Sequence, residues 1–78
     1  MTKVLLLGPA REAAGRGRDE ISAQTVGELL ARCVERYGPD FARVAAVSQI
    51  WLNAEETTPD ASVGPYDEVA VVPPISGG

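Results

Sequence analysis

The hydrophobic pattern near the N-terminus of this 78-residue chain predicts a β-hairpin. Residues 3–7 are mainly apolar and end at Gly8-Pro9, which is the signature of a strand and its exit. Residues 19–23 are predicted to form a weaker second strand that pairs with the first. Between the two strands we expect a loop with one helical turn at residues 10–14, because two glycines follow it and stop a longer helix.

One long amphipathic helix follows the hairpin. Thr25 and Glu28 have the spacing of a capping box, in which a hydroxyl and a carboxylate accept hydrogen bonds from amides at a helix start. Behind this cap, apolar residues recur every three or four positions and predict a helix with one buried face. Gly38-Pro39 predicts the end of this helix. The apolar positions are Val26, Leu29, Leu30, Cys33, Val34 and Tyr37.

The second half of the chain predicts a short helical turn and then three strands. The turn, which we expect to pack on the core, contains Phe41, Val44, Ala45 and Val47. Residues 49–53 form a strand with Ile50 and Leu52 on one face, residues 55–58 a short edge strand, and residues 68–72 the last strand. The order of elements predicts an α+β fold: a mixed sheet of four to five strands with one main helix packed on one face.

Composition and charge narrow the possible functions. A single domain of 78 residues has little room for a deep catalytic cleft. The net charge of −4 argues against nucleic acid, because phosphate binding needs a basic face. The run containing Arg11, Arg16 and Arg18 is interrupted by Glu12, Asp19 and Glu20, and we interpret it as a solvated loop. No apolar run approaches the roughly 18–20 residues that span a bilayer, so we expect no membrane partner and a cytoplasmic protein.

The chain has one cysteine and no histidine. This excludes an intramolecular disulfide, a Cys/His metal site and the usual nucleophile and base pairs, and we expect no bound metal. Cys33 lies on the apolar stripe of the long helix, which favours a small core residue over a reactive thiol. We therefore expect a protein that is not catalytic alone and on which an enzyme acts.

The last six residues carry the strongest functional signal. They are Pro73, Pro74, Ile75, Ser76, Gly77 and Gly78. The two prolines end an uncharged strand by removing backbone donors and stiffening the exit. The two glycines carry the terminal carboxylate and have no side chains. A chain end of this kind can enter a channel that is too narrow for a residue with a Cβ. A terminal glycine pair also arises by chance or from a cloning scar, but its position directly after a core strand favours function. We divide the chain into a domain, 1–72, and a flexible tail, 73–78.

At this point the chain resembles the β-grasp, ubiquitin-like sulfur carriers of the MoaD/ThiS family, and within it the small subunits of molybdopterin synthases. The resemblance covers essentially the whole chain and rests on Lys3-Val4-Leu5, Arg11-Glu12 with Gly15, Leu52-Asn53, Asp67-Glu68-Val69 and the six-residue tail. Two positions depart from the family pattern. Tyr66 stands where the family has glycine, so we expect the turn to be built on Gly64-Pro65, and Ala54 follows Asn53 where glycine is common.

The resemblance implies a chemistry for the tail. An E1-like (MoeB-like) adenylating enzyme would use ATP to activate the carboxylate of Gly78, and a sulfur donor protein would convert it to a thiocarboxylate. The loaded tail would enter the large (MoaE-like) subunit of molybdopterin synthase and give its sulfur to the pterin precursor. Gly77 and Gly78 would be the reacting end, and the preceding four residues their arm. No cofactor would be bound by this chain itself.

Partner binding is predicted on the sheet face opposite the helix. If Val4 and Leu6 face the helix, alternation turns their neighbours outward. The predicted open-face patch consists of Leu5, Leu7, Trp51 and Val72. In the alternative arrangement, Trp51 covers a loop as ordinary core.

Two other functions remain open at this point. The chain could be a sulfur carrier for thiazole or cysteine synthesis or a ubiquitin-like protein modifier, which share the activated tail and differ in the acceptor. It could also be a non-catalytic interaction module with an incidental Gly-Gly end.

Overall fold

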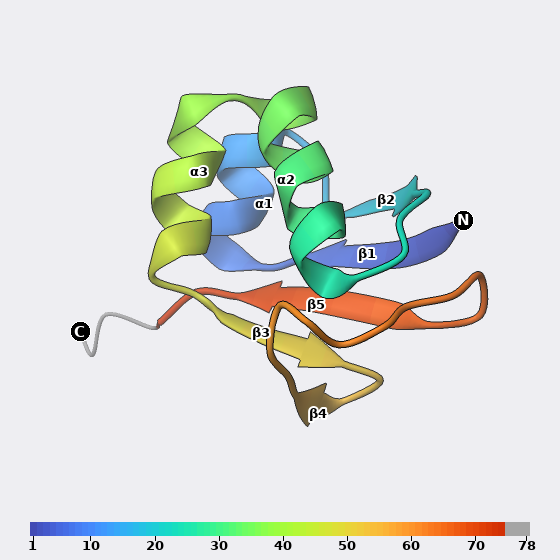
Figure 1. Cartoon of the computed structure of the whole chain (residues 1–78). Coiled ribbons are helices and arrows are strands. Elements are labelled where there is room, and N and C mark those ends of the chain that lie inside the picture. Colours follow the sequence, from blue (N-terminus) through green and yellow to red (C-terminus); the bar gives the residue numbers. More distant parts are fainter. Residues whose placement is uncertain (75–78) are drawn as a thin grey trace.

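Within residues 1–74, which the computed structural model describes, three helices cover one face of a five-stranded sheet (Figure 1). The strands are β1 (Thr2–Leu6), β2 (Arg18–Ile21), β3 (Gln49–Leu52), β4 (Glu55–Glu56) and β5 (Glu68–Val72). The helices are α1 (Gly8–Ala14), α2 (Val26–Tyr37) and α3 (Pro39–Ala46). The predicted α+β class and mixed sheet are confirmed.

The strand order is β2-β1-β5-β3-β4, so the last strand of the chain lies in the middle of the sheet. β5 runs parallel to β1, with Leu6 opposite Val71, and antiparallel to β3, with Ile50 opposite Val71. A parallel pair needs a long crossover connection, and here the helices and the β3–β4 hairpin lie between the two strands in sequence. The chain therefore leaves the sheet from a central strand, not from an edge.

The core lies between the sheet and the helices. Alternate residues of the two central strands point into it, as the sequence pattern predicted, and each fully buried Val, Leu or Phe side chain contributes about 1.5–3 kcal/mol relative to an exposed one. The buried apolar residues are Val4, Leu6, Ala10, Ile21, Val26, Leu29, Cys33, Phe41, Val63, Val69 and Val71.

The capping box at the start of α2 is present. The Thr25 hydroxyl accepts a hydrogen bond from the Glu28 N–H at 3.1 Å. The Glu28 carboxylate accepts one from the N–H of Gln24 at 3.0 Å, one residue earlier than in the usual box. The two side chains therefore fix the beginning of the helix where the sequence predicted it.

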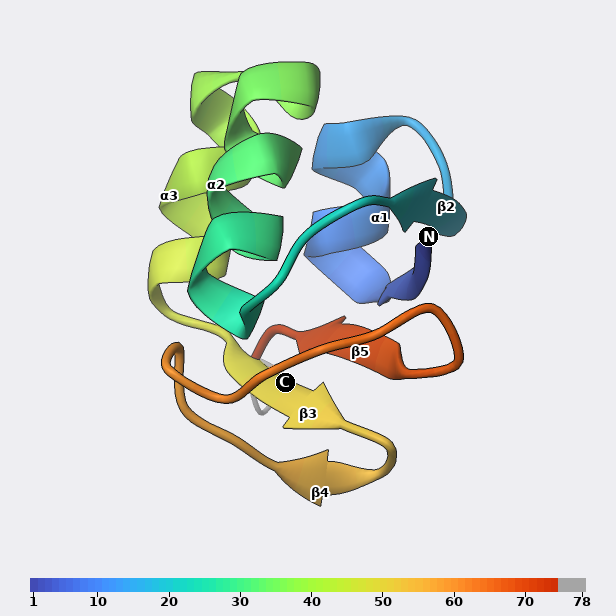
Figure 2. The same ribbon diagram turned by 45° about the vertical axis from the view of Figure 1, so that its right-hand side comes forward.

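The loop between β4 and β5 also holds the start of α2, and Figure 2 shows it passing below the first turn of that helix. The N–H groups of Val26 and Gly27 donate to the carbonyls of Ala61 and Pro59 at 2.9 and 2.8 Å. A Cβ on Gly27 would come within 3.2 Å of the Pro59 carbonyl oxygen, so only glycine fits without a shift. The loop thus satisfies two amides that a free helix end would leave to water.

Two helical segments are longer than predicted. The expected turn at residues 10–14 is the seven-residue helix α1, which ends at Gly15 in a left-handed conformation (φ 75°). The expected turn near Phe41 is the eight-residue helix α3. The predicted main helix, α2, is the longest of the three with 12 residues, and two shorter helices pack beside it, because tertiary packing supplies most of the stability of a helix. Every helix within residues 1–74 is too short or too polar to cross a membrane.

The placement of Val47 in the core was wrong. The N–H of Val47 and the hydroxyl of Ser48 both donate to the Val44 carbonyl, at 3.2 and 2.7 Å, and close the end of α3. The chain then turns toward β3, and Val47 remains 68% exposed. The edge strand predicted at residues 55–58 is also shorter, with only two residues in β4.

The two turns that depart from the family pattern lie side by side. Asn53 and Ala54 both have positive φ, 50° and 69°, so alanine occupies a conformation that glycine adopts more easily. In the second turn the Asp67 N–H donates to the Gly64 carbonyl at 3.1 Å, as expected for a turn built on Gly64-Pro65. The Asn53 amide donates to the Asp67 carboxylate at 2.9 Å and lowers the pKa of that carboxyl. This bond ties the two turns together.

Candidate functional site

The root of the tail is fixed by both neighbours of β5. The Leu7 N–H donates to the Val71 carbonyl at 3.3 Å on one side, and Gln49 pairs with Val72 on the other. Pro73 is buried and Pro74 is exposed, so Pro73 is the last anchored position within the described residues. The predicted tail residues Ile75, Ser76, Gly77 and Gly78 lie outside the described residues.

The four residues of the predicted open-face patch lie on the sheet face opposite the helices. Leu5, Ala70 and Trp51 are register partners across β1, β5 and β3 and form one row. Leu7 and Val72 continue the patch toward the root of the tail. Leu7 is 45% exposed, and the other members of the patch are partly exposed. Trp51 is half-buried and is not among the buried core residues, and both its role in binding and the alternative that it covers a loop stay untested predictions.

Charges flank this apolar row unequally. The register partner of Leu5 on β2 is Arg18, and the partner of Trp51 on β4 is Glu56. All seven cationic residues lie at or before position 43, whereas five acidic residues and no cation follow it. On the open face, Glu56 therefore lies beside Trp51 at the β4 edge, and Arg18 lies beside Leu5 at the β2 edge. A partner that covers this face meets an apolar centre between opposite charges.

One buried carboxylate lies on the helix side of the sheet, where the sequence suggested a solvated loop. Asp19 of β2 is only 10% exposed, accepts hydrogen bonds from Arg36 at 2.8 Å and from the Tyr37 hydroxyl, and has Arg16 at 3.6 Å. Burial raises the pKa of Asp19, but the bonds from Tyr37, Arg36 and the Glu20 N–H outweigh it and lower that pKa to about 2. Such a carboxylate is a poor proton acceptor, so this cluster joins β2 to α2 and is not a catalytic site.

We expect the stabilisation from Asp19 to depend on pH. The pKa is lower in the folded chain, about 2, than the ordinary value of 3.8. The contribution is therefore complete above about pH 4 and is lost as the pH falls toward about 2. It amounts to about 1–2 kcal/mol, because the Arg36 partner is half exposed and partly screened by water.

Urea unfolding of the parent and of Asp19→Asn checks this prediction. The gap in unfolding free energy between the two proteins should shrink between neutral pH and about pH 2. A gap that stays constant over this range would contradict the assignment.

Cys33 is fully buried on α2, and burial raises the pKa of its thiol to about 12. A thiol with that pKa holds almost no thiolate at neutral pH, and the thiolate is the reactive form. The prediction that Cys33 is a core residue is confirmed, and the sulfur chemistry suggested by the tail does not use it.

The chain is similar in sequence and in fold to known proteins. The model of the ThiS family matches residues 4–78. The molybdopterin synthase sulfur carrier subunit of Arabidopsis thaliana is 38% identical over 79 residues, which is 97% of this chain and 81% of that protein. The crystal structure of SAMP1 from Haloferax volcanii has a TM-score of 0.81 and 26% identity, covering 99% of this chain and 98% of its own.

A further solved structure is the complex of subunits 1 and 2 of the molybdopterin-converting factor from Helicobacter pylori. The match has a TM-score of 0.75 and 23% identity, covering 99% of this chain and 97% of that one. At this identity the likeness concerns the fold. Together these structures confirm the ubiquitin-like β-grasp fold expected from the sequence.

Proposed function

The chain belongs to the ThiS family, and from this premise we propose that it is a sulfur carrier for molybdopterin synthesis, loaded as a thiocarboxylate on Gly78. The observation that carries the proposal is the 38% identity, over 97% of this chain, to a molybdopterin synthase sulfur carrier subunit. The sequence supplies the matching chemistry, because Gly77-Gly78 follows the central strand β5 after a four-residue arm, residues 73–76. The chain is the sulfur-donating small subunit of a larger enzyme and has no activity alone.

The loading chemistry explains why the chain needs an enzyme partner. A free carboxylate is a poor electrophile, so an adenylating enzyme first joins Gly78 to AMP and releases pyrophosphate from ATP. A sulfur donor protein then supplies sulfur at the level of hydrosulfide, whose attack on the acyl carbon forms the C–S bond, releases AMP and leaves a thiocarboxylate. ATP belongs to the adenylating partner, and this chain binds no cofactor. Because the reaction consumes ATP, we assign it to the cytoplasm.

The partner on which the sulfur reaches the pterin precursor is the large synthase subunit, by analogy with the two-subunit complex from Helicobacter pylori. The open-face patch supports this proposal, since contiguous exposed apolar residues on a small domain are typical of protein interfaces. The patch also lies beside the strand that carries the tail. Docking there would bring the loaded Gly78 and the pterin precursor into one active site.

Intact-mass measurement tests the proposed function. The purified chain is incubated with ATP, an adenylating enzyme of this family and a sulfur donor protein. We expect the mass increase of one sulfur atom replacing one oxygen atom, and no increase without ATP. If the mass stays unchanged with active partners, the sulfur-carrier function is wrong.

Protein modification is a second candidate, favoured by the likeness to SAMP1, a small archaeal modifier protein. In this function the activated Gly78 would form an amide with a lysine of another protein and release AMP. The same incubation with cell extract distinguishes the two outcomes. Covalent adducts that carry the chain on other proteins would favour modification, and sulfur transfer to the pterin precursor on the large subunit would favour molybdopterin synthesis.

The open-face patch gives a prediction that separates recognition from chemistry. Trp51→Ala or Leu7→Glu should weaken binding to the large synthase subunit by at least about 1–2 kcal/mol, because each change removes an interface anchor or buries an unpaired charge. Folding should be little affected, since both residues lie away from the helix-covered core. Titration calorimetry and circular dichroism melts check the two parts.

A chemically supplied thiocarboxylate provides the control. At excess large subunit the same variants should recover sulfur transfer, because the reacting end is unchanged and only occupancy is lost. A large drop in melting temperature with unaltered affinity would contradict the prediction.

A further inference from the structure

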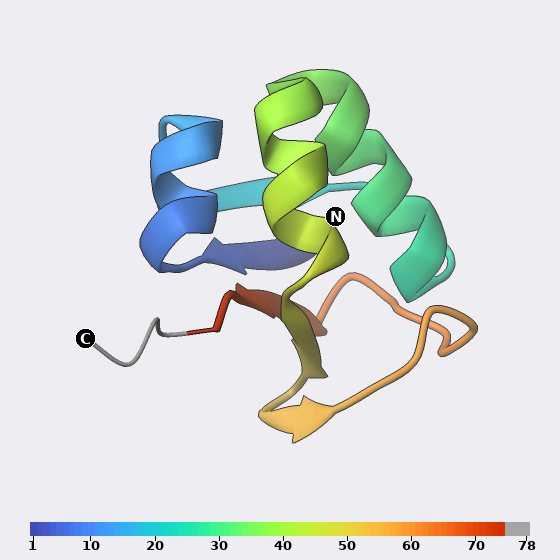
Figure 3. The same ribbon diagram turned by 90° about the vertical axis from the view of Figure 1, so that its left-hand side faces the viewer.

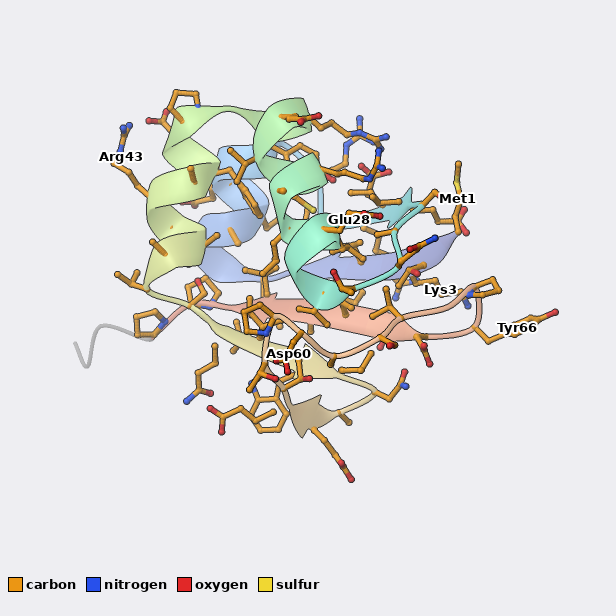
Figure 4. All side chains as sticks on the ribbon, viewed as in Figure 1. Met1, Lys3, Glu28, Arg43, Asp60 and Tyr66 are labelled. Carbon is orange, nitrogen blue, oxygen red and sulfur yellow. The ribbon has the colours of Figure 1, made fainter. Side chains whose placement is uncertain are left out.

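Exposed apolar side chains gather at the two ends of the sheet. Within residues 1–74 the large apolar residues that are clearly exposed are Met1, Leu7, Val47 and Tyr66, at 67%, 45%, 68% and 97%. Met1 and Tyr66 both lie at the end of the sheet where β1 and β5 begin (Figure 4). Leu7 and Val47 belong to the opposite end, where β5 finishes and the tail begins.

Leu7 and Val47 flank the root of the tail from two sides. The N–H of Leu7, just after β1, donates to the Val71 carbonyl at 3.3 Å. Val47 lies two residues before Gln49, which is the register partner of Val72. Figure 3 shows α1 and the α3–β3 connection on either side of the end of β5. We call Leu7, Val47 and the exposed Pro74 the exit surface.

The three sequence segments that contribute these residues contain no charged side chain. Residues 4–10, 44–54 and 69–78 contain no Asp, Glu, Lys or Arg, in a chain of which 23% of residues are charged. A single exposed valine is normal on a protein surface. The absence of charged side chains from all three segments around the end of β5 is unusual for a surface. We interpret it as a sign that a partner with an apolar surface binds there.

The length of the tail limits how far away that partner can be. Within residues 1–74 the last buried residue is Pro73, and five residues, 74–78, follow it in the sequence. At about 3.3–3.6 Å per residue the terminal carboxylate lies at most about 17–18 Å from Pro73. Any enzyme that reacts with Gly78 must therefore bring its active site within that distance, so its surface comes close to the end of β5.

We propose that the exit surface is covered by an apolar rim around the tail-binding cleft of the large synthase subunit, so that the interface extends beyond the open face to the α3–β3 connection. This inference rests on the proposed function. It makes Val47 a partner-binding residue outside the predicted open-face patch. Because the surface is uncharged, its contribution to binding is insensitive to salt, unlike that of the charges flanking Leu5 and Trp51.

Two substitutions of Val47 and a matched control at the other end of the sheet test the proposal. Val47→Asp and Val47→Ser are compared with Tyr66→Ser, which removes a still more exposed apolar side chain far from the tail. Each variant is first loaded with sulfur and verified by intact mass, and its melting temperature is recorded. The KM for the loaded carrier and the kcat of sulfur transfer to the large subunit are then measured at low and high salt.

We expect Val47→Asp to raise KM at least about tenfold, because a carboxylate under an apolar rim is left unpaired. Val47→Ser should raise KM less, with the same ratio to the parent at both salt concentrations. The kcat and melting temperature should stay at parental values, and Tyr66→Ser should change none of these quantities.

Different outcomes would contradict the covered exit surface and the sulfur-carrier function. If the parent is loaded and transfers sulfur while Val47→Asp keeps the parental KM, the exit surface is not covered and only this inference is overturned. The same holds if Tyr66→Ser raises KM as much as Val47→Asp. If the parent cannot be loaded with active partners, the sulfur-carrier function fails and the inference fails with it.

Discussion

Deleting Gly78, or adding one residue after it, should abolish sulfur loading and leave the fold intact. Each change moves the terminal carboxylate by about 3.3–3.6 Å along the tail. A displacement of even about 1 Å can cost about a hundredfold in rate when reacting groups are held in a fixed geometry, so we expect loss of more than about a hundredfold. The fold should be unaffected, because the buried core residues all lie at or before Pro73 in the part of the chain that the structure describes.

Intact mass after incubation with ATP, the adenylating enzyme and the sulfur donor measures this effect. A circular dichroism melt of each variant provides the folding control, and Ser76→Ala, which keeps the length of the tail, provides the matched control. We expect Ser76→Ala to be loaded. An extended chain that is loaded without first being trimmed by a protease would show that the position of the carboxylate is not fixed.

Leu29→Ala should cost about 2–5 kcal/mol of unfolding free energy. Leu29 is fully buried on α2, so truncation removes apolar contacts and leaves a cavity between the helix and the sheet. A small domain has a total stability of only about 5–15 kcal/mol, so this change consumes a large share of it. Chemical denaturation of parent and variant gives the difference directly.

The adjacent residue supplies a control of identical chemistry. Leu30 is only partly buried at the margin of the core, and we expect Leu30→Ala to cost less than Leu29→Ala. The sequence alone suggested equal costs for the two positions, because both lie on the apolar stripe. Equal losses in the two variants, or a loss below about 1 kcal/mol for Leu29→Ala, would mean that this face of α2 is misassigned.

The features that the sequence predicted well depend on residues close together in the chain. The capping box at Thr25 and Glu28 and the three- and four-residue spacing behind it place α2 within one residue of its observed bounds. Alternation along residues 3–7 and 68–72 was enough to separate the core face from the open face of the sheet. A turn of helix and a strand are each set by neighbouring residues, so their signals survive in the linear pattern.

The tail was the other strong signal, and the family match over residues 4–78 agrees with it. The chemistry of the tail could be predicted from the sequence because the proposed reacting group is the chain terminus itself. No arrangement of distant side chains had to be known. The sulfur-carrier hypothesis therefore did not depend on predicting the helices correctly.

The features that needed the tertiary structure combine residues far apart in sequence. Asp19 looked solvated because its neighbours are charged, yet pairing with Val4 of β1 turns it toward Arg36 and Tyr37. Val47 looked like a core residue because apolar positions precede it at helical spacing, but the end of α3 leaves it exposed. Local pattern cannot determine such cases, because burial is decided by what packs opposite.

The exit surface shows most clearly which features the sequence predicts and which need the tertiary structure. The sequence by itself determined the two prolines, the glycine end and the apolar character of Leu7 and Val47. Only the insertion of β5 between β1 and β3 brought positions 7, 47 and 74 to one end of the sheet. The physical reason is that strand order is set by long-range pairing and packing of the whole core, and these interactions leave no periodic signal at the residues they bring together.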